Sequence, residues 1–376
     1  MRRALFALLA LLVCSMLACS GSSRTRKPND LTAVTNQFEM KEIWTANVGS
    51  SEPYYFDPMV AGDSVYAASA SGKLVRLDLQ TGKTIWEVSV PDRLAVGPGS
   101  DGKTTVAVSA KGMVYAFDEA GKNMWSVSVG SEVLTEPIVA AGTVVIRTLD
   151  NRFMGLDVLT GKRRWFYQRQ QSVLSLRVGY GMLLVNNEVI VTGLSSGRFG
   201  MIGVNNGALI WETSVSFPKG FSEIERLNDV SAKPSLEGDK LCAVSYQGKI
   251  GCSMVRTGNL IWSKDFSSYT GTAQGPELVF ASNEKSQVAA FKSADGTQVW
   301  ETSKLNWRDL GEPTAIGRVL LFGDAEGYLH AISQANGEIV ARIRHDTSPI
   351  ASAPVVAGGL VLVQSQGGKL VAYQPK

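Results

Sequence analysis

The residues most able to do chemistry in this sequence are few and widely spaced. Cys242 and Cys252 flank the segment VSYQGKIG, and Cys19 follows a short apolar run near the N-terminus. The two histidines, His330 and His345, are too few for a histidine-based metal site. No G-x-S-x-G, Walker or H-E-x-x-H motif occurs, so the common nucleophilic, phosphate-binding and zinc chemistries have no signature here. The sequence therefore predicts no catalytic residues, no metal site and no cofactor.

Cys242 and Cys252 are spaced so that they can face each other. The segment between them is typical of two short strands joined by a turn at Gln247-Gly248. Positions equally distant from such a turn lie opposite one another in a hairpin. A cross-strand disulfide is one interpretation, and it requires an oxidising compartment such as the periplasm. Two buried free thiols are the other, because cross-strand bridges place narrow limits on geometry.

The N-terminal segment is predicted to be a secretory signal spanning residues 1–18. Arg2 and Arg3 precede an apolar run that ends in a small residue, which is the pattern of a signal peptide. The run is too short for a transmembrane span. The cut before Cys19 resembles the lipobox of bacterial lipoproteins, and the resemblance implies that Cys19 is lipidated. Ser20 follows instead of the Asp that typically retains lipoproteins at the inner membrane, and a plain signal peptide with a chance cysteine is the alternative.

The remaining chain is nearly neutral. Without Arg2 and Arg3, 35 basic residues stand against 34 acidic ones. Nucleic-acid binding needs a concentrated basic surface, so this balance argues against a nucleic-acid partner. Residues 20–36 are polar and poor in aromatic side chains. We therefore expect a lipidated cysteine with a flexible tether over 19–37.

A short segment recurs through the rest of the chain with a period near 40 residues. LQTGKTIW (79–86), VLTGKRRW (158–165) and VRTGNLIW (255–262) are near-copies. A period of this length indicates repeat architecture. The recurring glycines are Gly82, Gly121, Gly161, Gly207, Gly258, Gly296 and Gly337.

Each repeat predicts four short strands. In 58–86, three β-rich runs are followed by a turn with glycine and a fourth run that carries Trp86. Four antiparallel strands per ~40 residues make one blade of a β-propeller. Eight units can be counted. The last stops after three strands at Lys376, and the missing fourth strand is at 38–48. The sequence thus predicts an all-β, eight-bladed propeller over 38–376, closed by pairing of its N- and C-terminal segments.

The glycine and the tryptophan of the repeat have separate expected roles. Glycine allows the positive φ of a tight turn between the third and fourth strands. The tryptophan is expected to pack between adjacent blades, because one blade alone cannot bury its faces. Ala341 replaces the tryptophan in the seventh copy, so that interface must be filled in another way.

Two consecutive connections between blades are longer than the others. Trp165 precedes the next blade by 18 residues and Trp211 by 23, against 12 to 14 elsewhere. Neighbouring connections should emerge side by side and form a composite surface. Apolar residues rimmed by charges are typical of protein contacts; the alternative is that the leucines fold back onto the ring. The candidate partner-binding residues are Leu174, Leu176, Arg177, Arg226, Leu227 and Asp229.

The T-G-x-x-x-W repeats resemble those of pyrroloquinoline quinone (PQQ) propellers, some of which are dehydrogenases. That resemblance offers a quinone-dependent oxidoreductase as an alternative function. Those enzymes have large insertions around the quinone and calcium and adjacent cysteines over the cofactor. This chain has neither, since eight units fill residues 38–376, and a non-enzymatic role is favoured.

The whole pattern resembles the BamB family of outer-membrane β-barrel assembly lipoproteins. The lipobox, the tether, eight PQQ-type blades, LSLR at 174–177 and EIERLND at 223–229 carry the resemblance. It implies that the two loops dock onto the periplasmic POTRA domains of BamA, with other assembly-complex subunits nearby. Ser231 departs from the family pattern, which has a second Asp there. An envelope-binding propeller with another partner is a further alternative.

The resemblance implies a scaffold without turnover, anchored by lipid at the periplasmic face of the cell outer membrane. It would support the folding and insertion of outer-membrane proteins. Unfolded outer-membrane proteins are themselves potential partners, since a strand could be added at a blade edge. Closure of the ring argues against strand addition, because it leaves only short edges.

Overall fold

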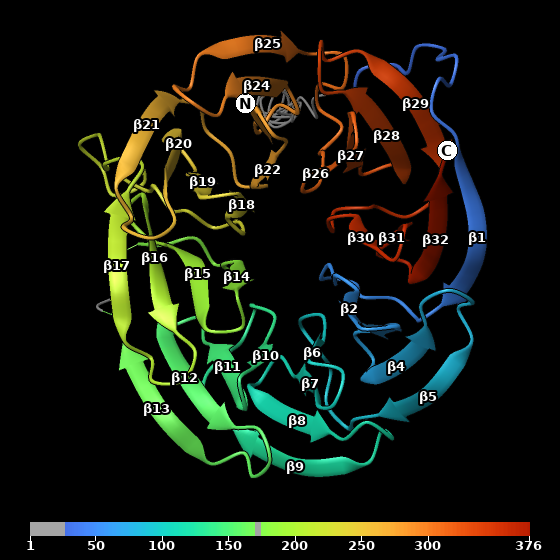
Figure 1. The fold of residues 1–376 in the computed structure, drawn as a ribbon, viewed down its shortest axis with the longest axis vertical. Helices are drawn as coiled ribbons and strands as arrows, with labels where there is room; N and C mark the ends of the chain where they lie inside the picture. Colours follow the sequence, from blue (N-terminus) through green and yellow to red (C-terminus); the bar gives the residue numbers. More distant parts are fainter. Residues whose placement is uncertain (1–26, 170–173) are drawn as a thin grey trace, which may run out of the picture.

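The chain folds into a closed ring of eight blades around a central axis (Figure 1). The structure is a computed structural model, and it describes residues 27–169 and 174–376. The predicted signal peptide and Cys19 lie outside the described residues. All regular elements in the described ranges are strands, and each blade is a four-stranded antiparallel sheet. The prediction of an eight-bladed propeller is confirmed.

The four strands of each blade lie side by side, in order from the axis to the rim. The innermost strands are β2 (Met59–Ala61), β6 (Gly99–Ser100), β10 (Ile138–Ala140), β14 (Met182–Val185), β18 (Ser235–Glu237), β22 (Thr272–Gln274), β26 (Thr314–Ile316) and β30 (Val355–Ala357). The second strands are β3 (Ser64–Ala68), β7 (Thr105–Val108), β11 (Thr143–Arg147), β15 (Val189–Leu194), β19 (Lys240–Val244), β23 (Leu278–Ser282), β27 (Val319–Gly323) and β31 (Leu360–Gln364).

The outer half of each blade completes the sheet. The third strands are β4 (Lys73–Asp78), β8 (Met113–Phe117), β12 (Arg152–Asp157), β16 (Arg198–Gly203), β20 (Lys249–Met254), β24 (Val288–Lys292), β28 (Tyr328–Ser333) and β32 (Lys369–Pro375). The outermost strands are β5 (Thr84–Ser89), β9 (Asn123–Ser128), β13 (Arg163–Gln168), β17 (Leu209–Ser214), β21 (Leu260–Asp265), β25 (Gln298–Thr302), β29 (Ile339–Arg344) and β1 (Met40–Asn47). We number the blades 1 to 8 in the order of their innermost strands.

Blade 8 closes the ring with both ends of the described chain. β1 pairs antiparallel with β32, with Met40 opposite Pro375 and Asn47 opposite Lys369. The sheet order is β1-β32-β31-β30. The closure expected from the unfinished last repeat is thus observed, and β32, which would otherwise be an edge strand, is paired on both sides.

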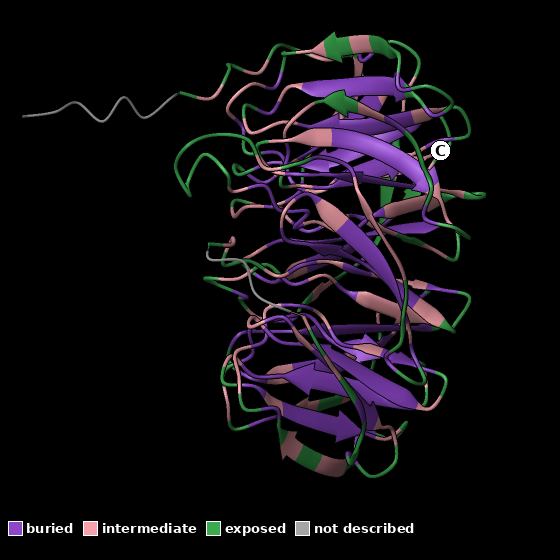
Figure 2. Cartoon of the chain, turned by 90° about the vertical axis from the view of Figure 1, so that its left-hand side faces the viewer, coloured by how far each residue is buried: buried purple, intermediate pink, exposed green. Residues whose placement is uncertain are grey.

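The core of the protein lies between blades. Each of the eight buried apolar clusters draws its side chains from two adjacent blades. The second and third strands together supply most of them; β3, β11 and β27, for example, are buried along their whole length, whereas outermost strands alternate toward solvent (Figure 2). A blade therefore has two apolar faces that only its neighbours can cover.

The repeat tryptophans join neighbouring blades in one recurring arrangement. The indole N–H donates to a backbone carbonyl of the next blade at 2.8 to 3.0 Å, as from Trp44 to Leu79 and from Trp165 to Val204. The ring covers that blade's turn glycine: a Cβ at Gly82 would lie 2.5 Å from Trp44, and one at Gly207 would lie 2.3 Å from Trp165. The glycines have positive φ, as predicted, and they also leave room for the indole.

The interface between blades 7 and 8 lacks a tryptophan because blade 8 lacks the turn. Its outermost strand comes from the other end of the chain, so no glycine turn joins β32 to β1. Ala341 is buried there beside Tyr373, and Phe38 and Met40 pack against the same cluster. The different filling expected at Ala341 is supplied by the closing segment.

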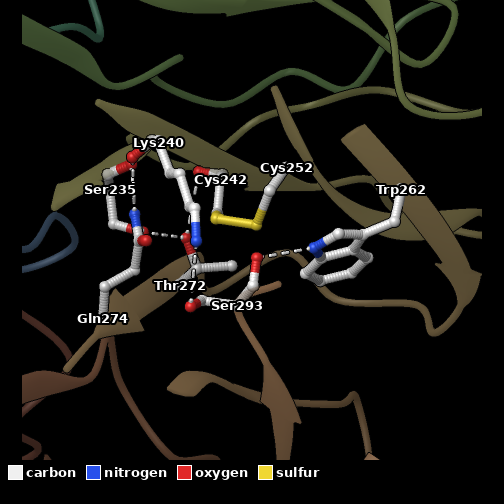
Figure 3. The surroundings of a disulfide bond; sticks show 8 residues. All are labelled: Ser235, Lys240, Cys242, Cys252, Trp262, Thr272, Gln274 and Ser293. Carbon is white, nitrogen blue, oxygen red and sulfur yellow. Dashed lines mark hydrogen bonds between the residues drawn. A yellow bond between two sulfur atoms is a disulfide. The ribbon is translucent and has the colours of Figure 1, made fainter. Parts of the chain in front are cut away.

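Cys242 and Cys252 lie opposite each other on β19 and β20, and the structure joins them by a disulfide. The bond is buried between blades 5 and 6, in the cluster that contains Trp262 (Figure 3). Thr272 of blade 6 donates to the carbonyl of Cys242 at 3.2 Å. The pair therefore links two strands of blade 5 next to the contact with blade 6.

The two faces of the ring differ. Four antiparallel strands bring each outermost strand back to the side where the next blade begins, so all connections between blades lie on one face. We call this side the connection face and the opposite side the turn face. Residues 29–37, within the predicted tether, lie along blade 7 and are hydrogen-bonded to it. Among the described residues, no helix is long and apolar enough to cross a membrane.

Candidate partner-binding site

The two long connections meet on the connection face. One joins β13 to β14 and the other joins β17 to β18, so both flank blade 4. Asp229 of the second connection accepts a hydrogen bond from the backbone N–H of Leu176 in the first, at 2.7 Å. The same carboxylate accepts from the Tyr180 hydroxyl at 2.7 Å and from the Ser196 backbone at 3.2 Å. One buried side chain thus holds both connections and a turn of blade 4.

Arg147 lies beneath this junction as a buried cation. It donates to Thr192 Oγ1 and to the carbonyl of Gly193, both at 2.6 Å. Its guanidinium carbon lies 4.2 Å from the centroid of the Tyr180 ring, a cation–π distance. Burial lowers the pKa of Arg147 to about 9, so the side chain stays charged at neutral pH. Burial, and then the charge of Asp229, raise the pKa of Tyr180 well above its usual range.

The first connection presents apolar and basic side chains to solvent. Leu174 is 42% exposed and Val178 38%. Leu176 is half-buried, and its backbone N–H points inward to Asp229. Arg177 is exposed and forms an ion pair with Glu132 at 2.8 Å. An exposed pair of this kind contributes little to stability, so Arg177 can exchange Glu132 for a partner's carboxylate at low cost.

The second connection contains a tight turn closed by a capping box. Glu225 accepts from the backbone N–H groups of Phe221 and Ser222, at 2.8 and 3.1 Å, and the Ser222 hydroxyl accepts from the N–H of Glu225 at 3.2 Å. Such reciprocal bonds fix a chain that would otherwise be free to move. The turn holds Phe221 and Ile224 in solvent, at 105% and 69% exposure. These side chains form an apolar projection from the second connection.

The predicted site residues therefore fall into three groups. Leu174, Arg177 and Arg226 are exposed, and Leu176 and Leu227 are partly buried. Asp229 is 1% exposed, and its carboxylate accepts hydrogen bonds from the Leu176 backbone and the Tyr180 hydroxyl within the protein. Its role in this structure is to position the surface.

Sequence reasoning did not single out Phe217, Phe221, Arg147 or Tyr180. Phe217 is 68% exposed, just before the capped turn. The S-x-x-E spacing of Ser222 and Glu225 was a readable capping signal, and both phenylalanines precede it. Arg147 was missed because two of its acceptors, Thr192 and Gly193, come from blade 4 and are distant in sequence. Ser231, which stands where the family pattern has Asp, is buried, and its hydroxyl has no hydrogen-bond partner among the described residues.

A second group of charged side chains gathers around the axis. Asp57, Glu136, Lys233 and Glu312 each immediately precede the proline that begins a blade, in blades 1, 3, 5 and 7. Burial raises the pKa of Glu136 to about 8 and that of Glu312 to about 7. Burial alone would lower the pKa of Lys233, but the three carboxylates raise it above its usual value. In the described ranges, no three histidine, cysteine or acidic side chains are arranged to hold a metal ion.

Together, the fold and the paired connections define an eight-bladed β-propeller that displays one composite loop surface. A sequence profile described as "Outer membrane protein assembly factor BamB" matches residues 15–88, 70–302 and 284–376. The chain belongs to the BamB family.

Individual relatives cover nearly the whole chain. The outer membrane protein assembly factor BamB of Burkholderia pseudomallei is 36% identical over 360 residues, which is 96% of this chain and 94% of that protein. The BamB of Bordetella pertussis is 38% identical over 365 residues, 97% of this chain and 94% of that protein.

Solved structures show the same fold. The crystal structure of BamB from Moraxella catarrhalis matches with a TM-score of 0.82 at 24% identity, over 89% of this chain and all of that one. A quinohemoprotein alcohol dehydrogenase from Pseudomonas putida HK5 matches with a TM-score of 0.71 at 13% identity, over 90% of this chain and 76% of that one. At these identities the likeness concerns the fold alone.

Proposed function

We propose that this protein is a non-enzymatic scaffold in outer-membrane protein assembly, anchored by lipid at Cys19 to the periplasmic face of the outer membrane. The names of the near-full-length relatives support the assembly role. The proposed partner is the set of POTRA domains of BamA, and the two long connections jointly form the surface that binds them. The likeness to a quinohemoprotein alcohol dehydrogenase, at 13% identity, concerns the fold and does not support an enzymatic role.

The observation that carries the docking proposal is the bond between Asp229 and Leu176. It fixes two loops that would otherwise move independently, so the exposed side chains on them keep one arrangement. Preorganised loops lose less conformational entropy on binding than mobile ones. Leu174, Arg177 and Phe221 then offer two apolar anchors beside a cation, a composition favoured in protein contacts.

The test replaces Leu174, Leu176 and Arg177 together by alanine and measures recovery of the partner after gentle detergent extraction. Loss of a central anchor typically costs about 2 kcal/mol or more of binding, so we expect recovery to fall sharply. Leu159→Ala is the matched control, since Leu159 is 69% exposed but lies in the turn between β12 and β13, on the turn face. Recovery of the triple variant at wild-type yield refutes the docking site.

Two further measurements address the anchor and the alternative activity. Mass spectrometry of the mature protein should find a lipid on Cys19, and Cys19→Ser should release the protein from membranes. Addition of PQQ and calcium should give neither cofactor absorbance nor dye reduction. Dye reduction would establish the oxidoreductase alternative.

A further inference from the structure

Residues 29–37 form a strap along the rim of blade 7. The backbone N–H of Gln37 donates to the carbonyl of Val340 in β29 at 2.8 Å. Arg342, also in β29, donates through its backbone N–H to the Asn36 side chain at 3.1 Å and through Nη1 to the carbonyl of Thr32 at 2.7 Å. In Figure 1 the blue segment that precedes β1 passes outside β29. The strap therefore covers the outer edge of blade 7.

The first residues of the strap are fastened to a buried ion network. Arg308 is 3% exposed and donates to Asp324 at 2.7 Å, to Glu326, and to the carbonyl of Asn29 at 3.1 Å. The Asn29 backbone donates to the carbonyl of Asn306 at 2.9 Å. Asp324 and Glu326 hold the Arg308 guanidinium in place. Its bond to the Asn29 carbonyl has a charged donor, and such bonds are stronger than those between neutral groups.

An apolar contact lies next to this polar attachment. Leu31 packs against the cluster of blades 6 and 7 that contains Leu305 and Leu310. Asn306 and Arg308 lie in the connection from β25 to β26. The strap consequently begins at the connection face.

The strap changes where the N-terminal segment leaves the ring. β1 begins at its turn-face end, as every outermost strand does, so an unattached segment before Met40 would depart from there. With the strap docked, the chain leaves from Asn29 beside the connections. Lys27 is eight positions after Cys19, a length that spans at most about 28 Å. Without the strap, the twenty positions from Cys19 to Glu39 could span at most about 70 Å.

We propose that the strap orients the ring on the membrane, with the connection face toward a phospholipid surface. The proposal rests on the lipid anchor at Cys19 from the proposed function. The short exit holds that face near the bilayer at blade 7. The loops of Leu174 and Phe221 lie on the same face on either side of blade 4, two to three blades around the ring from that exit. A partner bound there would occupy the space between the ring and the lipid.

The test compares two fluorescent labels on the full lipidated chain in phosphatidylethanolamine–phosphatidylglycerol vesicles that carry a headgroup acceptor dye. Lys285→Cys places a label on the connection face, in the turn between β23 and β24, and Arg318→Cys places one on the turn face, between β26 and β27. Both side chains are exposed. We expect energy transfer about twofold or more higher from position 285, because the exit spans at most about 28 Å.

Two variants test the cause of this difference. Leu31→Ser with Asn36→Ala removes strap contacts and leaves the blade residues intact, so it should abolish the difference between labels and speed amide exchange at Asn29 and Gln37. A twelve-residue Gly-Ser insertion before Lys27 should also abolish the difference while amide exchange stays slow. Either variant that keeps the original difference contradicts the proposal.

The outcomes separate this inference from the function on which it rests. Equal transfer from both labels on vesicle-bound protein, or higher transfer from position 318, refutes the orientation and leaves the anchor and the docking site in place. Failure of the protein to bind vesicles refutes the anchor, and the orientation with it. Partner recovery through the Leu174 loop is measured in detergent and does not depend on either result.

Discussion

The carboxylate of Asp229 and the backbone N–H of Leu176, 53 residues apart in sequence, form a 2.7 Å hydrogen bond between the two long connections. The bond is buried below an exposed surface, since Asp229 is 1% exposed and Leu174, two residues from Leu176, is 42% exposed. A residue that resembles a family contact residue thus acts here as a support. Its replacement would change the exposed surface of both connections, which its own side chain does not reach.

Asp229→Ala should therefore weaken both the fold and partner capture. Three donors lose their acceptor, and buried unsatisfied groups cost roughly 1–3 kcal/mol each before relaxation. We expect a lower free energy of unfolding and faster amide exchange at Leu176 and Ser196. Asp239→Ala is the control, because Asp239 is exposed in the turn between β18 and β19. Unchanged exchange at Leu176 in Asp229→Ala would contradict the supporting role.

Replacing a turn glycine by alanine should cost more stability than its positive φ alone explains, because the added Cβ also meets the indole ring. Gly161 and Gly130 have nearly the same φ, 70° and 71°. A Cβ at Gly161 would lie 2.7 Å from the ring of Trp125, whereas one at Gly130 would meet nothing within 4 Å. Both substitutions should cost about 1–2 kcal/mol for the left-handed conformation.

Gly161→Ala should cost about 1–3 kcal/mol more, because it also overpacks the interface with Trp125. Chemical denaturation of the two variants measures the difference directly. Equal losses of stability would show that the indole contact adds nothing to the requirement for glycine.

His345 should contribute a loss of stability in mild acid, against the opposite contribution of the buried carboxyls Glu136 and Glu312, whose pKa values are raised. Its Nδ1 accepts from the Tyr373 hydroxyl at 3.0 Å and its Nε2 donates to the carbonyl of Lys369 at 3.2 Å, an arrangement of the neutral ring. Burial lowers the pKa of His345 from 6.5 to about 4. Above pH 6.5 both the folded and the unfolded states hold a neutral ring, and this histidine adds no pH dependence.

As the pH falls from 6.5 toward 4, His345 becomes protonated in the unfolded chain but stays neutral in the folded protein. The protein should lose roughly 3 kcal/mol over this interval from His345. The pKa of buried His330 is also lowered, chiefly by burial, so part of the slope remains in His345→Gln. Unfolding free energies of both proteins between pH 4 and 8 provide the measurement. The other buried groups contribute equally to both profiles, so a difference between the two proteins that stays constant from pH 6.5 to 4 would contradict the assignment.

Reduction should destabilise blade 5. The bond between Cys242 and Cys252 encloses a short loop with a sequence separation of 10, for which the loop-entropy relation gives about 3 kcal/mol. We expect a lower unfolding midpoint with a reductant. Alkylation of denatured protein should label neither cysteine until reductant is added. Labelling of both cysteines without reductant would establish the free-thiol alternative.

The repeat pattern alone determined the architecture. Strand alternation, turn glycines and the tryptophan are local signals, and each recurs in nearly every copy. An irregular copy, such as the one without tryptophan at 335–341, therefore does not change the predicted number of blades. The unfinished unit ending at Lys376 and the solitary strand around Trp44 even specified the closure. The two long connections were visible as a change in spacing. The sequence therefore predicts both the ring and the two long connections that interrupt its regular spacing.

Tertiary structure decided which side chains act at that place. Asp229 is acidic and lies among charged residues, so its sequence neighbourhood is typical of an exposed contact. It is buried because Tyr180 and Leu176, from another connection, direct their donors toward it. The pairing of each tryptophan with the next blade's glycine, and of Arg308 with Asn29 across 279 residues, also depends on contacts between distant segments. Local sequence fixes backbone conformation, but burial and partners arise only when the ring closes.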